Sequence, residues 1–205
     1  MTTKLIWITP EAEKHIAYCA RVSSDIQENP EYEKLFRYLI KHNHWSPFEM
    51  ASMCVEIETT RMISQQLLRH RSFSFQEFSQ RYSDRIRIDF VEPRLQGAGR
   101  QGGEVPASSA AHEWWREQQV WLHEHTLRVY AEALAQDIAK ECARAILPMI
   151  TSTRLYMSGT IRSWIHYVNV RTEAHTQKEH RMLAKEIGEV LVEQCPVIGK
   201  MLENL

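Results

Sequence analysis

The hydrophobic pattern changes its period within the first third of the chain, and this change restricts the folds that are available. Residues 31–42 carry apolar side chains three and four apart, as one face of an amphipathic helix requires. Residues 51–58 instead carry apolar side chains at alternate positions, as in a half-buried strand. Residues 60–71 return to helical spacing. The pattern therefore predicts helices and strands mixed in one structure.

Further elements follow from the same signals. The glycine-rich stretch 96–110 holds four of the seven glycines and predicts a mobile loop. The region 111–142 suits either one long helix or a broken pair, and Pro148 interrupts the chain after it. The other predicted elements are strands at 4–9 and 84–91 and helices at 11–23, 158–168 and 173–194.

These elements predict an α+β fold: a small antiparallel sheet packed with helices, and a helical C-terminal half. The 205 residues suffice for one domain with a sizeable core, and no internal repeat divides them. We therefore expect residues 1–205 to form a single domain. The pattern does not determine the order of the strands.

The charge balance narrows the class of partner. The formal net charge is −1, whereas a protein that coats nucleic acid usually has a strong basic excess, so we expect no nucleic-acid polymer as partner. Arginine nevertheless outnumbers lysine by 17 to 8. Because the guanidinium fork binds phosphate and carboxylate bidentately, this excess justifies a search for anionic ligands, although a general preference for Arg on solvated surfaces would give the same count.

The cysteines and the apolar runs indicate the compartment. Cys19, Cys54, Cys142 and Cys195 show no C-x-x-C spacing, which argues against a zinc ribbon or a thioredoxin-like centre and suits a reducing cytosol. The N-terminal apolar run is too short for a signal peptide, and no stretch has the apolar length of a membrane span. We expect a cytoplasmic protein with no membrane partner.

The segment RHRSFSFQEFSQRY, which begins at Arg69, concentrates polar groups. Residues two apart on a helix point to nearly opposite sides. Arg69 and Arg71 therefore serve one small ligand only if the helix ends before them; otherwise they serve different groups, such as different active sites of an oligomer. If the chain is extended from Glu77 through Ser79 to Arg81, these three project from one face, where a hydroxyl beside a guanidinium would anchor phosphate. The alternative is a solvated polar turn.

This segment resembles the signature of the flavin-dependent thymidylate synthases, which is Arg-His-Arg, seven residues and then Ser. The matching residues are Arg69, His70 and Arg71, the seven residues from Ser72 to Phe78, and Ser79. The extended signature adds three polar positions, matched here by Glu77, Arg81 and Tyr82. The signature is specific, because several fixed polar positions must coincide.

Elements elsewhere resemble the same family, so the resemblance covers most of the chain. They are ARVS at 20–23, HNHWSPFE at 42–49, ARAILP at 143–148 and RSWIHYVNVR at 162–171. The sequence departs from the family at three positions where Asn is frequent, which are Gln76, Thr160 and His166.

The resemblance implies an activity. Members of the family convert dUMP to dTMP: 5,10-methylenetetrahydrofolate supplies the carbon, FAD reduced by NADPH supplies the hydride, and tetrahydrofolate leaves. They are homotetramers whose active sites lie at subunit junctions. Carried over, the cofactor would be FAD, with NADPH as reductant, and the small-molecule partners would be dUMP and the folate.

The resemblance also implies residue roles. Arg171 would be catalytic, as a cation near uracil N3 and the neighbouring carbonyl that stabilises negative charge while the ring becomes enolate-like. The residues that would bind FAD are Ser46, Arg69, His70, Arg71, Glu77, Thr160, Arg162 and His166. The residues that would bind dUMP are Gln66, Arg69, Glu77, Phe78, Ser79, Gln80, Arg81, Arg144 and Arg171. Ser23 and His175 are weaker flavin-side candidates, and His44 would lie near the flavin ring and the folate.

Neither a nucleophile nor a metal is expected. No His and carboxylate relay accompanies Ser79 in the sequence, so we expect Ser79 to contact phosphate or uracil. The closely spaced histidines lack metal-ligand spacing. They are His42 and His44, His123 and His125, and His175 and His180. No G-x-G-x-x-G follows a predicted strand, so NADPH is not expected on a Rossmann unit.

Two other hypotheses remain open on the sequence alone. One is a non-enzymatic RNA-binding module that presents Arg69, Arg71, Phe73 and Phe75 and binds RNA in a salt-sensitive way. The other is a helical metal-dependent hydrolase that chelators inhibit. Only the flavin hypothesis predicts a yellow protein, so a spectrum of fresh protein separates the three.

Overall fold

The computed structural model describes residues 1–97 and 101–202. By its internal contacts the chain divides into two compact units. The first contains residues 1–58, 66–77 and 154–205, and the second contains residues 59–65 and 78–153. In the part of the chain that the structure describes, no helix is long and apolar enough to cross a membrane.

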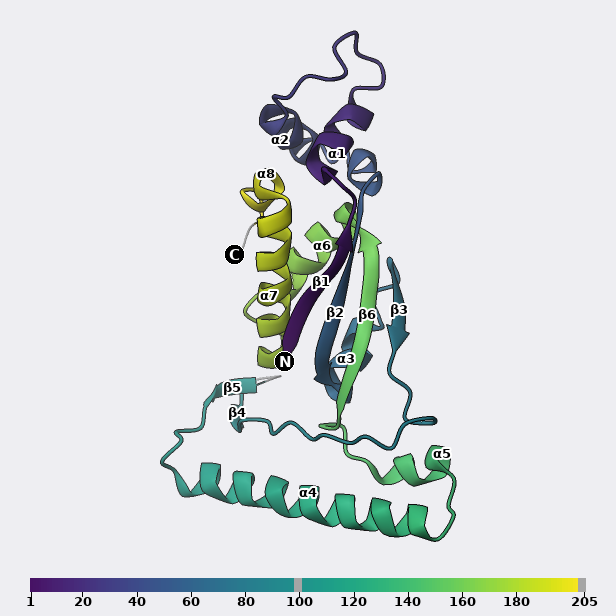
Figure 1. The fold of residues 1–205 in the computed structure, drawn as a ribbon. Helices are drawn as coiled ribbons and strands as arrows, with labels where there is room; N and C mark the ends of the chain where they lie inside the picture. Colours follow the sequence, from purple (N-terminus) through teal and green to yellow (C-terminus); the bar gives the residue numbers. More distant parts are fainter. Residues whose placement is uncertain (98–100, 203–205) are drawn as a thin grey trace. The chain divides into compact units, whose positions relative to one another are not determined.

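The main sheet has four strands in the order β1-β2-β6-β3 and lies almost entirely in the first unit (Figure 1). β1 and β2 are antiparallel, and so are β3 and β6. Side-chain pairs from Glu58 to Arg154 and from Glu56 to Tyr156 show the same antiparallel sense between β2 and β6. The strands span Thr2–Ile8 (β1), Ser52–Thr60 (β2), Phe73–Glu77 (β3) and Ser152–Thr160 (β6). The small antiparallel sheet confirms the α+β prediction.

Strand β6 was not predicted, and the helix expected at 158–168 begins only after it. Residues 158–160 belong to β6, and α6 spans Ile161–Arg171. The alternation is visible in the sequence: Leu155 and Met157, which are fully buried, alternate with Arg154 and Tyr156, which are exposed. This alternation is the period of a strand.

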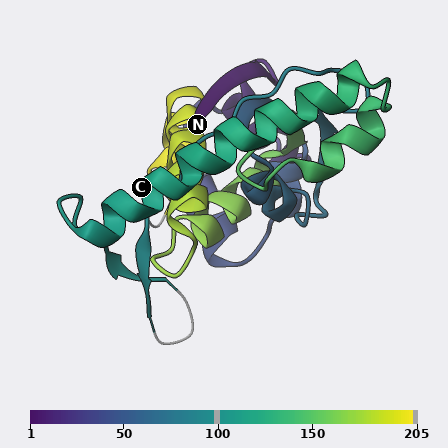
Figure 2. The same ribbon diagram turned by 90° about the horizontal axis from the view of Figure 1, so that it is seen from below.

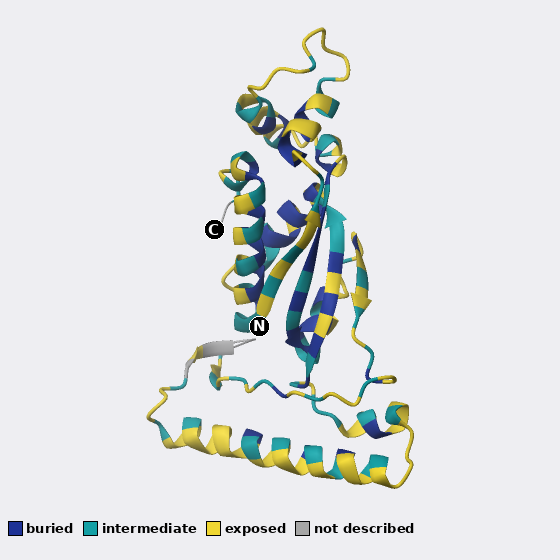
Figure 3. Cartoon of the chain, in the orientation of Figure 1, coloured by how far each residue is buried: buried dark blue, intermediate teal, exposed yellow. Residues whose placement is uncertain are grey.

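The core lies between the sheet and helices α6 and α7, the latter spanning Lys178–Gln194. Met53, Val55 and Ile57 of β2 are fully buried (0% exposed). Helix α7 packs against β1 and α6, and buried positions gather on the inner sides of both helices (Figure 3). The Trp164 indole donates to the Met53 carbonyl at 3.0 Å, so the sheet and α6 are joined by a hydrogen bond as well as by apolar contact.

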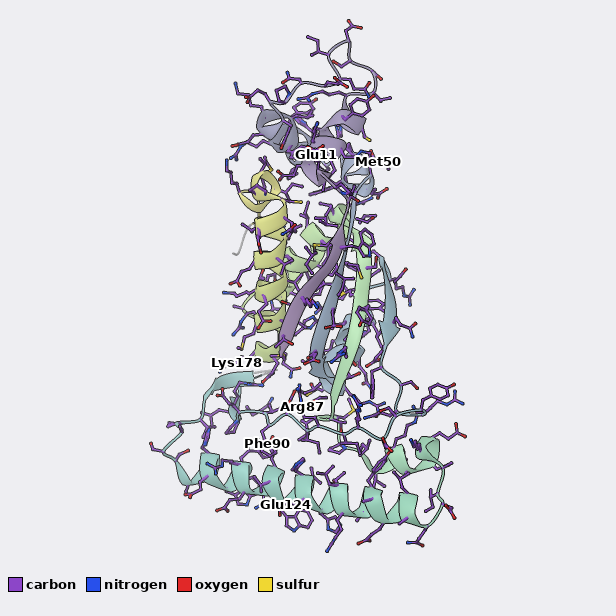
Figure 4. The ribbon with its side chains drawn as sticks, in the orientation of Figure 1. Glu11, Met50, Arg87, Phe90, Glu124 and Lys178 are labelled. Carbon is purple, nitrogen blue, oxygen red and sulfur yellow. The ribbon has the colours of Figure 1, made fainter. Side chains whose placement is uncertain are left out.

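The N-terminal helices follow the predicted pattern. Phe36 and Phe48 are fully buried, with ring centroids 5.4 Å apart. Glu11 adopts a left-handed conformation (φ 48°) directly before α1, whose start is marked in Figure 4. The elements are α1 (Ala12–Ala20), α2 (Glu33–Lys41), the 3-10 helix η1 (Ser46–Glu49) and, near the C-terminus, α8 (Pro196–Gly199).

In the second unit the predicted strand at 84–91 is wrong. Only Ile88 forms an isolated bridge, to Thr151. The backbone of Val91 bonds instead to side chains of helix α4 (Ala110–Ala135). The Val91 N–H donates to Gln119 Oε1 at 2.8 Å, and the Val91 carbonyl accepts from Trp115 Nε1 at 2.8 Å. Around the bridge, the Asp89 N–H donates to the Ile150 carbonyl at 3.1 Å and the Ser152 N–H donates to the Arg87 carbonyl at 2.7 Å. The segment, on which Arg87 and Phe90 are labelled in Figure 4, is therefore paired at one point and forms no strand.

The prediction of a loop at 96–110 is also wrong in part. Arg94–Gln96 (β4) and Gln101–Glu104 (β5) pair as a small antiparallel ribbon. Residues 98–100 of the predicted loop lie outside the described residues.

The region 111–142 contains one long helix followed by a short one. Helix α4 spans Ala110–Ala135 without a break (Figure 2). It begins at Ser109, whose hydroxyl accepts from the His112 N–H at 3.2 Å. Asp137 has φ 58°, and α5 (Lys140–Ala143) and the 3-10 helix η2 (Arg144–Ile146) follow.

Candidate active site

The end of helix α3 (Arg61–Leu67) determines how the arginine-rich segment runs. A stretch of turns containing Arg69 and Arg71 follows the helix and leads into β3. The His70 N–H donates to the Leu67 carbonyl at 2.9 Å. The helix therefore ends before the two arginines, which is one of the two possibilities that the sequence leaves open.

A hydrogen bond joins two of the resembling segments, 101 residues apart: Arg171 Nε donates to His70 Nε2 at 2.9 Å. Arg171 is the last residue of α6, and both side chains are half-buried. A guanidinium has only donors, so His70 accepts with Nε2 and carries its proton on Nδ1. The contact therefore requires a neutral His70.

Aromatic rings surround His70 and explain why it stays neutral. Its ring centroid lies 5.1 Å from that of Tyr167 and 6.4 Å from those of Phe73 and His180. The pKa of His70 is lowered to about 4, first by burial and then by the electrostatic effects of Arg171 and His166. At neutral pH the imidazole is therefore available as an acceptor for Arg171.

A hollow of about 510 Å³ lies beside α6. Arg162 and His166 are four residues apart on this helix and both line it. Arg162 also forms an ion pair with Glu49 of η1. The complete lining is Trp45, Glu49, Ser72, Arg162, Ser163, Ile165, His166 and Asn169. Two predicted flavin ligands thus share one hollow with donor groups of several kinds.

Thr160 is the N-cap residue of α6. Its hydroxyl accepts from the Ser163 N–H at 3.3 Å and so caps the helix. The Ser163 hydroxyl in turn donates to the Ser72 carbonyl at 3.3 Å. The cap therefore connects the start of α6 with the chain that follows the arginine-rich turn.

Within the second unit, two predicted dUMP ligands meet at Glu141. Arg81 Nε donates to the Glu141 carboxylate at 3.1 Å, and Arg144 Nε donates to the Glu141 backbone carbonyl at 3.3 Å. The Arg81 and Glu141 side chains are each 53% exposed. The structure thus brings these two arginines together around one acidic residue.

The extended arrangement considered for Glu77, Ser79 and Arg81 is wrong. Strand β3 ends at Glu77, and residues 80–82 form a turn. The Ser79 hydroxyl accepts from the Arg81 N–H at 3.3 Å, and the Ser79 carbonyl accepts from the Tyr82 N–H at 3.3 Å. Ser and Thr hydroxyls commonly stabilise such turns, which explains why the alternation does not continue.

The remaining expected ligands lie in varied environments. Gln66 is half-buried and bonds to Gln177 and His180. Gln80 is buried, with its Oε1 accepting from Arg61 at 2.7 Å. Glu77 is half-buried, and the exposed candidates are Ser23, His44, Ser46, Arg69, Arg71, Phe78 and His175.

The site contains residues that the sequence reasoning missed. Trp45, Glu49 and Asn169 line the hollow, and all three stood inside segments already matched to the family, HNHWSPFE and RSWIHYVNVR. Tyr167 and His180 lie in the interior beside His70, and no sequence pattern indicated this. Residues 1–97 and 101–202 contain no group of three or more His, Cys, Asp or Glu side chains that could hold a metal ion.

Comparisons with known proteins agree over nearly the whole chain. Residues 4–197 match the family described as thymidylate synthase complementing protein. The flavin-dependent thymidylate synthase of Synechocystis sp. is 50% identical over 189 residues, which is 92% of this chain and 88% of that one. The "Probable flavin-dependent thymidylate synthase" of Paramecium bursaria Chlorella virus 1 is 43% identical and covers 99% of both chains.

A solved structure shares the fold. The UMP/dUMP methylase PolB from Streptomyces cacaoi, bound with 5-Br dUMP, superposes with a TM-score of 0.85 at 26% identity, over 97% of this chain and 93% of that one. The family match, the two relatives and this fold lead to one conclusion: the chain belongs to the flavin-dependent thymidylate synthase family.

Proposed function

We propose that this chain catalyses the reductive methylation of dUMP to dTMP, with 5,10-methylenetetrahydrofolate as carbon donor and NADPH-reduced FAD as hydride donor, and releases tetrahydrofolate. Its relation to the Synechocystis enzyme and to PolB supports the reaction class and the pyrimidine nucleotide substrate. The observation that carries the proposal is the Arg171–His70 hydrogen bond, because it holds a guanidinium among residues of the family's motifs.

The hollow beside α6 suits the cofactor chemically. It offers a guanidinium, an imidazole, an amide, hydroxyls and an indole ring, which are groups that bind a pyrophosphate and an aromatic ring system. We assign FAD to Arg162 and His166, together with Ser46, Arg69, His70, Arg71, Glu77 and Thr160. When bound, FAD supplies hydride transfer, while the chain supplies orientation and exclusion of water.

Glu49 competes with the cofactor for Arg162. Their ion pair is exposed, with 48% of the Arg162 side chain and 40% of the Glu49 side chain accessible. Such pairs contribute only about 0 to 1 kcal/mol. Arg162 therefore exchanges Glu49 for a pyrophosphate oxygen at little cost.

Arginines also suit the substrate. The dUMP phosphate is a dianion, and we assign it to Arg81 and Arg144, which already meet at Glu141. The other residues that we assign to dUMP are Gln66, Arg69, Glu77, Phe78, Ser79, Gln80 and Arg171.

Arg171 has the chemistry that C5 methylation requires. The reaction needs electron density at C5, and a cation near N3 and the neighbouring carbonyl stabilises the enolate-like ring. The Nε–H of Arg171 donates a hydrogen bond to His70, whereas the terminal N–H groups of Arg171 form no hydrogen bond with the described residues. His70 thus orients the guanidinium while leaving its far edge for the uracil.

We further propose a homotetramer with shared active sites, located in the cytoplasm. Trp114 and Trp121 on α4 are 58% and 62% exposed, and large exposed apolar residues support burial against another subunit. All four cysteines are free, which supports a reducing compartment.

The first experiment is an absorbance spectrum of freshly purified protein, followed by an assay of dTMP formation with dUMP, the folate and NADPH. We expect flavin absorbance and NADPH-dependent dTMP formation. A protein that stays flavin-free after incubation with FAD, or that makes no dTMP when flavin-loaded, would refute the proposal.

A further inference from the structure

His180 is a fully buried histidine (0% exposed) on α7 that the proposed chemistry does not use. Its Nδ1 lies 3.1 Å from Gln66 Oε1. Its ring lies 5.8 Å from Tyr167 and 6.4 Å from His70, centroid to centroid, so it belongs to the same aromatic cluster as the Arg171 contact. Burying a polar side chain costs free energy unless its polar atoms form hydrogen bonds, so the burial of His180 calls for an explanation.

A chain of hydrogen bonds determines which way each amide in the network points. Gln177 Nε2 donates to a Glu179 carboxylate oxygen at 2.9 Å, and a carboxylate only accepts. Gln177 therefore turns its Oε1 toward Gln66, whose Nε2 donates to it at 2.8 Å. That leaves Gln66 Oε1 facing His180. The orientation of Gln66 is thus fixed from both ends.

The state of His180 follows from the same chain. The pKa of His180 is lowered to about 3, by burial first, then by the charge of Arg171 and by repulsion from His70 when that is protonated, so the imidazole is neutral and carries one proton. Because Gln66 Oε1 accepts, this proton is on Nδ1. Nε2 has no partner among the described residues, and neither has the buried Tyr167 hydroxyl beside the ring. Nδ1 is therefore the nitrogen that acts on Gln66.

We propose that His180 is a positioning residue for dUMP recognition: its Nδ1–H locks the Gln66 amide in one orientation, with the second N–H and a free Oε1 lone pair left for the nucleotide. This inference rests on the proposed function, because Gln66 is one of the residues assigned to dUMP. An amide that flips presents a donor where the ligand needs an acceptor, so fixing its orientation favours binding.

Two substitutions separate this role from mere packing. Asn places its amide nitrogen near the position of imidazole Nδ1, whereas Gln places it near Nε2. We expect His180→Asn to keep the KM for dUMP within about twofold of wild type, and His180→Gln to raise it about tenfold with a similar kcat, as the loss of one orienting hydrogen bond implies. The matched control is His15→Gln, at an exposed position on α1, with an unchanged KM.

The KM for dUMP is measured by dTMP formation and the Kd by calorimetry on flavin-loaded protein. Equal values for His180→Asn and His180→Gln would overturn the inference while leaving the function intact. If wild type neither bound dUMP nor formed dTMP, the proposed function would fall, and the inference with it. If His180→Gln did not fold, Glu179→Gln would decide: it removes the obligate acceptor, so we expect a KM raised several-fold, and an unchanged KM would overturn the inference.

Discussion

Arg171 Nε lies 2.9 Å from His70 Nε2, and the two side chains come from different segments that resemble the family. If Arg171 binds the substrate as proposed, the contact orders its guanidinium beforehand and lowers the rotamer entropy that binding costs. In this contact Arg171 is always the donor, so the His70 imidazole must stay neutral to accept the hydrogen bond. His70 therefore prepares Arg171 whether or not it also touches the flavin.

Arg171→Ala tests the catalytic assignment. We expect the variant to keep flavin absorbance but to lose dTMP formation by about 100-fold or more, the usual cost of removing one group that stabilises developing charge. Flavin content and single-turnover dTMP formation are the measurements. Arg154→Ala, on the exposed side of β6 where Arg154 pairs with Glu58, is the control. Near-normal turnover in Arg171→Ala would remove Arg171 from the mechanism.

Ser79→Ala tests whether Ser79 is a ligand or a nucleophile. The Ser79 hydroxyl accepts a hydrogen bond within its own turn, which is a ligand-positioning arrangement rather than an activated one. We expect a higher KM for dUMP and partial activity. Complete loss of activity with dUMP binding intact would mean that the hydroxyl attacks the substrate.

The spacing of apolar residues correctly predicted those helices and strands that bury one face. The strand at 51–58 and the helix at 31–42 were found because one face of each is buried, as at Ile57 and Phe36. The strand expected at 84–91 did not form, because only Ile88 pairs by a bridge and the backbone of Val91 bonds to side chains of α4, partners that alternation does not reveal. The Gln66–His180 contact, 114 residues apart in the chain, could not be predicted because it exists only after folding.

Gly159→Ala tests the close approach between β6 and β3. A Cβ at this position would overlap Phe73 Cδ1, and Phe73 packs on Trp164 with centroids 4.6 Å apart. We expect a loss of about 1–3 kcal/mol in the free energy of unfolding, measured by urea denaturation, because the ring must leave a packed site. Gly103→Ala is the control, since nothing lies within 4 Å of its added Cβ. Equal stability of the two variants would show that the Phe73 ring can move aside without a measurable loss of stability.

Glu141→Gln tests whether Glu141 competes with the substrate phosphate for Arg81. The ion pair is exposed, so we expect a stability change below about 0.5 kcal/mol. Removing the carboxylate charge frees Arg81, and we expect the KM for dUMP to fall about two- to threefold. Glu132→Gln, which removes another exposed partner of an arginine in the same unit, should leave the KM unchanged. A KM that does not respond to Glu141→Gln would argue against Arg81 as a phosphate ligand.

His180 also predicts how stability depends on pH. Its folded pKa is lowered from 6.5 to about 3, so between these values the unfolded chain binds the additional proton and stability falls as pH falls. The contribution is complete above pH 6.5 and declines below it by at most about 1.4 kcal/mol per pH unit. We therefore expect wild type to lose stability relative to His180→Asn between pH 7 and pH 5, in urea titrations at fixed protein concentration. Other titrating groups are common to both proteins and largely cancel in the difference. A stability difference that stays constant over this range would mean that His180 takes up its proton in the folded protein as readily as in the unfolded chain, and would contradict the neutral tautomer on which its contact with Gln66 depends.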